Sequence, residues 1–143
     1  MRCGDLMKAL EMMKTHVQTT TPDATLAQAV DLMDLYQTPF LPAINEEKQC
    51  LGVISERDIV KVVANYGAER AMNMRVSEVM TQMVACVLEH QDVTDVLTTM
   101  FNGKWKRMPV VNDAFEIIGM LNRVDVLQAL FEGSIFYDLD ARS

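Results

Sequence analysis

Hydrophobic positions follow two different spacings along the first half of the chain, and the change between them marks the predicted elements. Apolar residues at 26–33 recur at the spacing of one helix face, whereas those at 40–44 and 50–54 form short unbroken runs. The first pattern predicts an amphipathic helix and the second predicts two strands. A further helix is predicted at 59–66, with its apolar positions buried. With a short extended segment at 17–20, the predicted order is β-α-β-β-α.

The second half of the chain repeats this pattern in a single register. Pro42 and Pro109 lie 67 positions apart, and the same offset relates further identical residues, including the pairs Gly52 with Gly119 and Asp58 with Asp125. The alignment runs without a gap from about residue 13 to residue 66. One constant offset for prolines, glycines and aspartates indicates an internal duplication.

The duplication defines the predicted domain organisation. Residues 1–66 form the first repeat with an N-terminal helical segment, 67–75 form a linker, 76–131 form the second repeat and 132–143 form a C-terminal tail. The tail is either a docking element or a frayed terminus. A single repeat of this size would bury only a marginal core. We therefore predict an α/β (α+β) fold in which two β-α-β-β-α repeats pack sheet to sheet about a pseudo-twofold axis.

Charge and cysteine usage narrow the classes of function. Thirteen basic and 20 acidic residues give a net charge of −7, which disfavours non-specific binding to nucleic acid. The chain has no secretion signal and no apolar stretch near the roughly 20 residues that span a bilayer, so we expect a cytoplasmic protein without a membrane partner. Cys50 and Cys86 are interpreted as buried small hydrophobes. The alternative is a zinc site, for which only His16 and His90 are available.

The candidate chemistry lies where the last strand of each repeat meets the helix that follows it. Ser55 precedes Asp58 by three positions, and Asn122 precedes Asp125 by the same interval. The first turn of a helix carries unpaired N–H groups and a partial positive charge, so it attracts anions. A carboxylate in that turn can accept both hydroxyls of a ribose. The same residues also fit a helix capping box, and the two roles can coexist.

These junctions, with the proline-containing strands before them, resemble the CBS domain, the module named after cystathionine β-synthase. The resemblance rests on Leu-Pro-Ala-Ile at 41–44 and Gly-Val-Ile-Ser-Glu-Arg-Asp-Ile at 52–59. Its second copy is Arg-Met-Pro-Val-Val-Asn-Asp at 107–113 with Gly-Met-Leu-Asn-Arg-Val-Asp at 119–125. The resemblance covers roughly residues 8–131. It implies a pair of CBS domains with two clefts, a homodimer, and an adenosyl ligand such as AMP, ADP, ATP or S-adenosylmethionine.

The resemblance also implies roles for particular residues. Asp58 and Asp125 would hold the ribose hydroxyls, while Ser55 and Asn122 would contact phosphate. Asn122 departs from the hydroxyl residue of the family pattern, although its amide can still donate to an oxygen. The adenine pocket would be lined by the start of the first strand and by residues beside the proline, namely Val17, Thr19, Phe40 and Leu41 in the first copy and Val84, Cys86, Arg107 and Met108 in the second.

The two clefts are expected to differ in charge. Residues 104–107 form one dense basic cluster, whereas their counterparts at 37–40 carry no charge. Arg107 is a candidate phosphate ligand. For Lys104 and Lys106 the alternative is a solvated loop whose charges complement a helix C-terminus. The second cleft is therefore better suited to a phosphorylated ligand, although the first has the better hydroxyl motif.

Regulatory ligand binding is the predicted function, and catalysis is not expected. The sequence contains no Ser/His/Asp set, no P-loop and no Rossmann glycine fingerprint. We expect a module that requires no cofactor, senses adenosyl nucleotides as an energy or metabolite signal, and acts on a separate effector protein. The alternative is a structural or oligomerisation module with vestigial clefts, which Asn122 and Phe40 favour.

Overall fold

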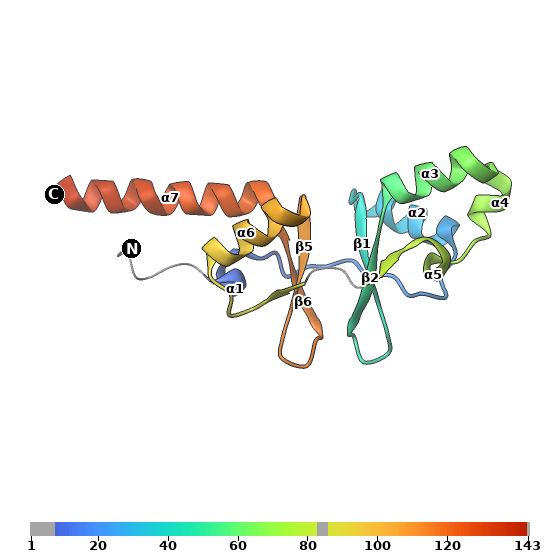
Figure 1. Cartoon of the computed structure of the whole chain (residues 1–143), viewed down its shortest axis with the longest axis horizontal. Helices are drawn as coiled ribbons and strands as arrows, with labels where there is room; N and C mark the ends of the chain where they lie inside the picture. The colour runs from blue at the N-terminus through green and yellow to red at the C-terminus, as the bar shows by residue number, and fades with distance from the viewer. Residues whose placement is uncertain (1–7, 83–85, 143) are drawn as a thin grey trace. The chain divides into compact units, whose positions relative to one another are not determined.

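The computed structural model describes residues 8–82 and 86–142, with side chains as far as residue 132 (Figure 1). Within that part of the chain, two three-stranded sheets have the orders β1-β2-β3 and β4-β5-β6. The predicted mixed α/β class is therefore confirmed. The elements are α1 Ala9–Met12, α2 Leu26–Leu35, β1 Phe40–Ile44, β2 Cys50–Ser55, α3 Glu56–Tyr66, α4 Ala68–Met72, α5 Val76–Val79, β3 Thr81–Gln82, β4 Val87–Leu88, α6 Val93–Gly103, β5 Arg107–Val111, β6 Ile117–Asn122 and α7 Arg123–Arg142.

The chain divides into two compact units, each of which contains one sheet. Unit 1 consists of Met1–Val17, Ala85–Asp113 and Ile118–Ser143, and unit 2 consists of Gln18–Val84 and Ala114–Ile117. The N-terminal segment, which the sequence analysis placed with the first repeat, thus groups with the strands and helices of the second repeat.

The two repeats exchange the segments that precede their first predicted strands. In unit 1, Lys14 forms an antiparallel bridge with Met120 of β6, and each backbone N–H donates to the other's carbonyl at 2.9 Å. In unit 2 the residues at the equivalent positions, Thr81 and Val53, pair in the antiparallel β2–β3 ladder. Each sheet is therefore completed by a segment that belongs, by sequence, to the other repeat.

The short helices α1 and α5 take part in the same exchange. The Ala9 N–H donates to the Gln91 carbonyl at 2.9 Å, and the equivalent Val76 N–H donates to the Ala24 carbonyl at 2.8 Å. In unit 1 the side chain of Lys8, the residue before α1, also hydrogen-bonds and ion-pairs with Asp92. This contact raises the pKa of Lys8.

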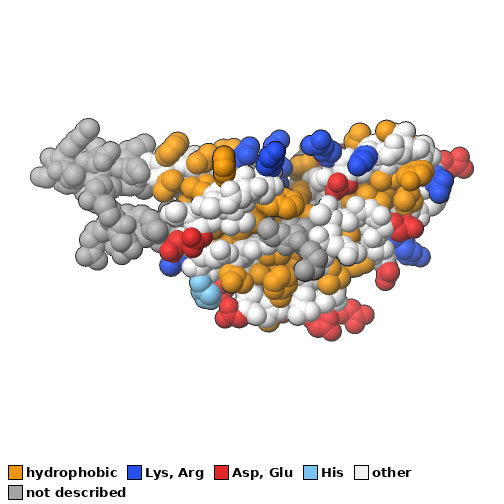
Figure 2. Space-filling model, in the orientation of Figure 1, with side chains coloured by type: hydrophobic (Ala, Val, Ile, Leu, Met, Phe, Trp, Pro, Cys, Tyr) orange, Lys and Arg blue, Asp and Glu red, His pale blue; other side chains and the backbone are white. Residues whose placement is uncertain are grey.

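Each unit has its own hydrophobic core. The fully buried side chains include Leu121 and Met108 in unit 1, and their repeat equivalents Ile54 and Leu41 in unit 2. The predicted buried face of α3 is only partly correct, because Ile59 is buried whereas Val63 and Tyr66 are exposed. On α7, Val124, Leu127 and Phe131 are likewise exposed, and hydrophobic side chains lie along the described part of this helix in Figure 2.

Several predicted element boundaries differ from the observed ones. The predicted strand at 17–20 is reduced to a parallel bridge between Thr20 and Ala43, and the predicted linker contains α4. Helix α7 continues to Arg142, beyond the predicted end at residue 131. That extension contains no proline, and its glycine costs only about 1 kcal/mol in a helix. Among the described residues, no helix combines the length and the apolar character needed to cross a membrane.

Candidate functional site

In unit 2 the predicted capping box at the β2–α3 junction is present in full. The Asp58 N–H donates to Ser55 Oγ at 3.2 Å, and the Ser55 N–H donates to Asp58 Oδ2 at 3.0 Å. Phe40, at the start of β1, lies opposite Ser55 in the ladder. One oxygen of the Asp58 carboxylate is therefore already used to hold the start of α3.

In unit 1 the β6–α7 junction is arranged differently. Asn122 Oδ1 accepts from the Val124 N–H at 2.9 Å, so the asparagine side chain satisfies the helix start without help from Asp125. Asp125 Oδ2 is buried and has no hydrogen-bond partner. The Lys14 ammonium lies 3.4 Å from this oxygen and forms an ion pair with it. The capping interpretation therefore does not account for Asp125.

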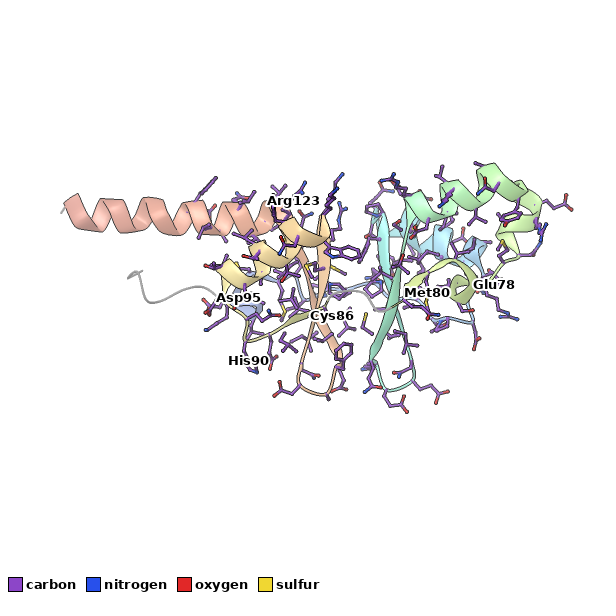
Figure 3. The ribbon with its side chains drawn as sticks, viewed as in Figure 1. Glu78, Met80, Cys86, His90, Asp95 and Arg123 are labelled. Carbon is purple, nitrogen blue, oxygen red and sulfur yellow. The ribbon has the colours of Figure 1, made fainter. Side chains whose placement is uncertain are left out.

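In both units the residue just before the proline-containing strand, β1 or β5, is bonded to the start of the helix that follows the sheet. The Glu56 N–H donates to the Pro39 carbonyl at 2.8 Å, and the equivalent Arg123 N–H donates to the Lys106 carbonyl at 2.9 Å. Because β5 and β6 are neighbours in their sheet, Arg107 at the start of β5 lies near the first turn of α7, where Figure 3 shows Arg123. The structure thus brings the basic start of β5 to the end of unit 1 that carries Asp125.

The residues predicted from the first strand of each repeat lie just before its parallel pairing. Thr19 precedes Thr20, and Cys86, labelled in Figure 3, precedes Val87 of β4, which pairs in parallel with β5. Thr19 also lines a cavity of about 450 Å³ against α2. Val17 is half-buried in the segment before Thr19.

Three of the predicted pocket residues, Leu41, Met108 and Val84, are not seen to line a cleft. Leu41 and Met108 are fully buried in the cores of their units, so neither residue presents exposed surface to a ligand. Val84 lies outside the described residues.

A second cavity of about 480 Å³ lies between the end of α2 and the start of α3, and its lining includes Thr38 and Glu56. Neither of these cavities is lined by Ser55 or Asp58.

Sequence reasoning missed Lys14, which the structure places beside Asp125. The two residues are far apart in the chain, and only the exchange of leading segments brings them together. The one available signal was that Lys14 aligns with the uncharged Thr81 under the repeat offset. Within the described part of the chain, no three His, Cys, Asp or Glu side chains are grouped in a way that could hold a metal ion.

The two three-stranded sheets, the duplicated strand–helix junctions and their equivalent hydrogen bonds define a tandem module of two related halves. The family model described as "CBS domain" matches residues 5–65 and 76–132. The chain belongs to the CBS domain family, and it carries two copies of the domain, as the resemblance implied.

Curated relatives include proteins of very different length. The chain is 31% identical over 121 residues to an inosine-5′-monophosphate dehydrogenase of Methanocaldococcus jannaschii, a match that covers 85% of this chain and 23% of that protein. It is 30% identical over 125 residues to an uncharacterized 17.7 kDa protein of Acidianus ambivalens, which covers 87% of this chain and 74% of that protein. The chain therefore spans about a quarter of the first relative and about three quarters of the second.

Solved structures share the fold at low sequence identity. A CBS domain pair in complex with 5′-methylthioadenosine and S-adenosyl-L-methionine superposes with a TM-score of 0.78 at 22% identity, covering 91% of this chain and 99% of that one. A CBS-pair protein of Arabidopsis thaliana in complex with AMP gives a TM-score of 0.74 at 22% identity, covering 89% of this chain and 98% of that one. Both neighbours therefore have the same fold and hold an adenosyl ligand.

Proposed function

We propose that this chain is a regulatory module that binds an adenosyl ligand, with Asp125 in unit 1 as the principal ribose acceptor. The observation that carries the proposal is the buried Asp125 Oδ2, which has no hydrogen bond although it stands in the first turn of α7. A buried acceptor without a donor costs about 1–3 kcal/mol, and a ribose hydroxyl would supply that donor. The ligands of the solved neighbours support the same ligand class.

The proposed ligand is AMP, ADP, ATP or S-adenosylmethionine, and the proposed output is a change in a separate effector protein in the cytoplasm. A regulatory role is supported by the relation to the dehydrogenase, because the matched region is a minor part of that enzyme's length. The site in unit 2 is proposed as the weaker one, because Asp58 is engaged in a capping box and Phe40 lies opposite Ser55. The alternative of a structural module with vestigial clefts applies best to this site in unit 2, at Ser55 and Asp58.

Isothermal titration of the purified chain with AMP, ATP and S-adenosylmethionine tests the proposal, with GTP as the control. We expect saturable binding of at least one adenosyl ligand with a stoichiometry near one per chain, because one junction has an available carboxylate. GTP is expected to bind at least tenfold more weakly, because a pocket that hydrogen-bonds one base rejects another. No binding across the panel by folded protein would favour the oligomerisation module.

We further propose that the chain forms a homodimer through the exposed face of α7. Val124, Leu127 and Phe131 recur at the spacing of one helix face and are 64%, 37% and 61% exposed. In unit 2 the exposed residues Val60 and Val63 place apolar area on the corresponding helix α3. A second copy is the proposed occupant because it would offer the same apolar surface in return.

Leu127→Glu is expected to convert the dimer to a monomer, because a carboxylate would be buried in an apolar interface. Light scattering during gel filtration measures the change as a halved mass. Gln128→Glu is the matched control, since it adds the same charge one position along the same helix and should leave the dimer intact. A monomeric wild-type chain, or a Leu127→Glu variant that stays dimeric, would contradict the proposed interface.

A further inference from the structure

The two equivalent strand–helix junctions differ in charge, although unit 2 has Arg57 where unit 1 has Val124. In unit 1, Lys14 forms a direct ion pair with Asp125, and the Lys106 carbonyl accepts from the first N–H of α7. Arg107 is the first residue of β5, and Arg123 is the first residue of α7. Figure 2 shows basic side chains gathered over the start of α7. At the equivalent positions in unit 2 stand Thr81, Pro39, Phe40 and Glu56. Every cation of the unit 1 junction is thus replaced by an uncharged or acidic residue.

Lys14 differs from the other cations of this junction in its relation to the carboxylate. Its backbone is fixed by two hydrogen bonds to Met120, so the side chain starts from a defined point on the sheet edge. Its ammonium lies 3.4 Å from Asp125 Oδ2 without a hydrogen bond, and its side chain is 73% exposed. The ammonium therefore stays within reach of the junction but is not locked to the carboxylate.

A ligand that occupies this junction meets both groups of the pair. When ribose hydroxyls donate to Asp125, the neighbouring ammonium is left to interact with whatever charge the ligand carries next to its sugar. A phosphate attracts the ammonium and forms charge-assisted hydrogen bonds with it. The sulfonium of S-adenosylmethionine is a cation and is repelled by it. The same position in unit 2, Thr81, exerts neither effect.

We propose that Lys14 determines the charge of the ligand at the unit 1 junction, so that phosphorylated adenosyl ligands are accepted and S-adenosylmethionine is disfavoured. This inference rests on the proposed ligand site at Asp125. Lys14 acts here as a specificity-determining residue, and Arg107 and Arg123 add to the positive potential without contacting the carboxylate.

The test compares the affinities of AMP and S-adenosylmethionine for the wild-type chain and for Lys14→Thr, the substitution that installs the unit 2 residue. We expect Lys14→Thr to weaken AMP binding by about fivefold and to strengthen S-adenosylmethionine binding by a similar factor, as expected for one partly screened charge. The ratio of the two affinities should therefore fall by more than about tenfold. Lys14→Arg retains the charge and should retain the preference, which a purely structural role would not require.

Lys61→Thr is the matched control, because it removes one exposed cation from α3 of unit 2. It should leave the ratio within about twofold of the wild-type value, because it removes a solvent-exposed charge that forms no ion pair with Asp125. If AMP binds but Lys14→Thr leaves the ratio unchanged, the role of Lys14 is wrong and the proposed ligand site stands. If neither ligand binds the folded wild-type chain, the proposed function fails, and the inference about Lys14 fails with it.

Discussion

Asp125→Ala is expected to weaken AMP binding by about 10- to 100-fold without lowering the free energy of unfolding. Hydrogen bonds to a charged acceptor contribute about 1.5–3 kcal/mol, which corresponds to that range of affinity. The substitution removes no hydrogen bond of the fold, because Asn122 already satisfies the start of α7 and Asp125 Oδ2 accepts none. It removes only the ion pair with the exposed Lys14 side chain, and such exposed pairs contribute little to stability. Isothermal titration gives the affinity, and urea denaturation gives the free energy of unfolding.

Asp58→Ala is the matched substitution in the other repeat, and the opposite pattern is expected for it. Its carboxylate closes the capping box with Ser55, so its loss should lower the free energy of unfolding by about 0.5–2 kcal/mol. AMP affinity should change by less than about threefold, since one oxygen of this carboxylate is engaged within the fold. Strong loss of binding in Asp58→Ala with none in Asp125→Ala would assign the principal site to unit 2.

Gly52→Ala is expected to destabilise the protein by about 1–3 kcal/mol, the usual cost of an added group in a closely packed place. A Cβ at this position would lie 2.5 Å from the backbone carbonyl oxygen of Thr81 and 3.3 Å from Sδ of Met80, which Figure 3 labels beside β2. A backbone oxygen cannot move without disturbing the pairing of β2 with β3. Urea denaturation should show a lower midpoint.

Gly119→Ala tests the same close approach in unit 1, where the neighbour can yield. Its Cβ would meet the Met13 side chain at 2.3 Å, but a methionine can change rotamer, and the nearest backbone atom, the Lys14 oxygen, lies at 3.0 Å. We expect a destabilisation about half that of Gly52→Ala. Equal losses in the two variants would mean that the exchanged segments are held with equal rigidity in both units.

Local features of the fold were predictable because their causes lie within a few residues of the chain. The Ser55–Asp58 capping box was predicted from spacing alone, and it is present, as is a second capping box at Thr25–Gln28. These features depend on short-range geometry, which a sequence pattern reports directly.

The parts that could not be predicted depend on contacts between distant segments. A constant offset is equally compatible with a leading segment that pairs within its own repeat and with one that pairs in the other repeat. The sequence therefore did not predict the exchange of leading segments. The Lys14–Asp125 ion pair follows from that exchange and was missed with it. The different arrangement of Asn122 was also missed, because its side chain can accept from the N–H of Val124, two residues on, or of Asp125, three residues on.

The exchange of leading segments sets an order in which the chain can fold as it is synthesised. Most of unit 2 is continuous, from Gln18 to Val84, so its sheet and the helices around it can assemble once that stretch has left the ribosome. Unit 1 cannot follow until β6 emerges, because Lys14 and α1 have their partners there and in the segment before α6. Lys14 and α1, although they precede unit 2 in the chain, are therefore placed after it. We expect the closing of that long loop to be the entropically costly step of folding.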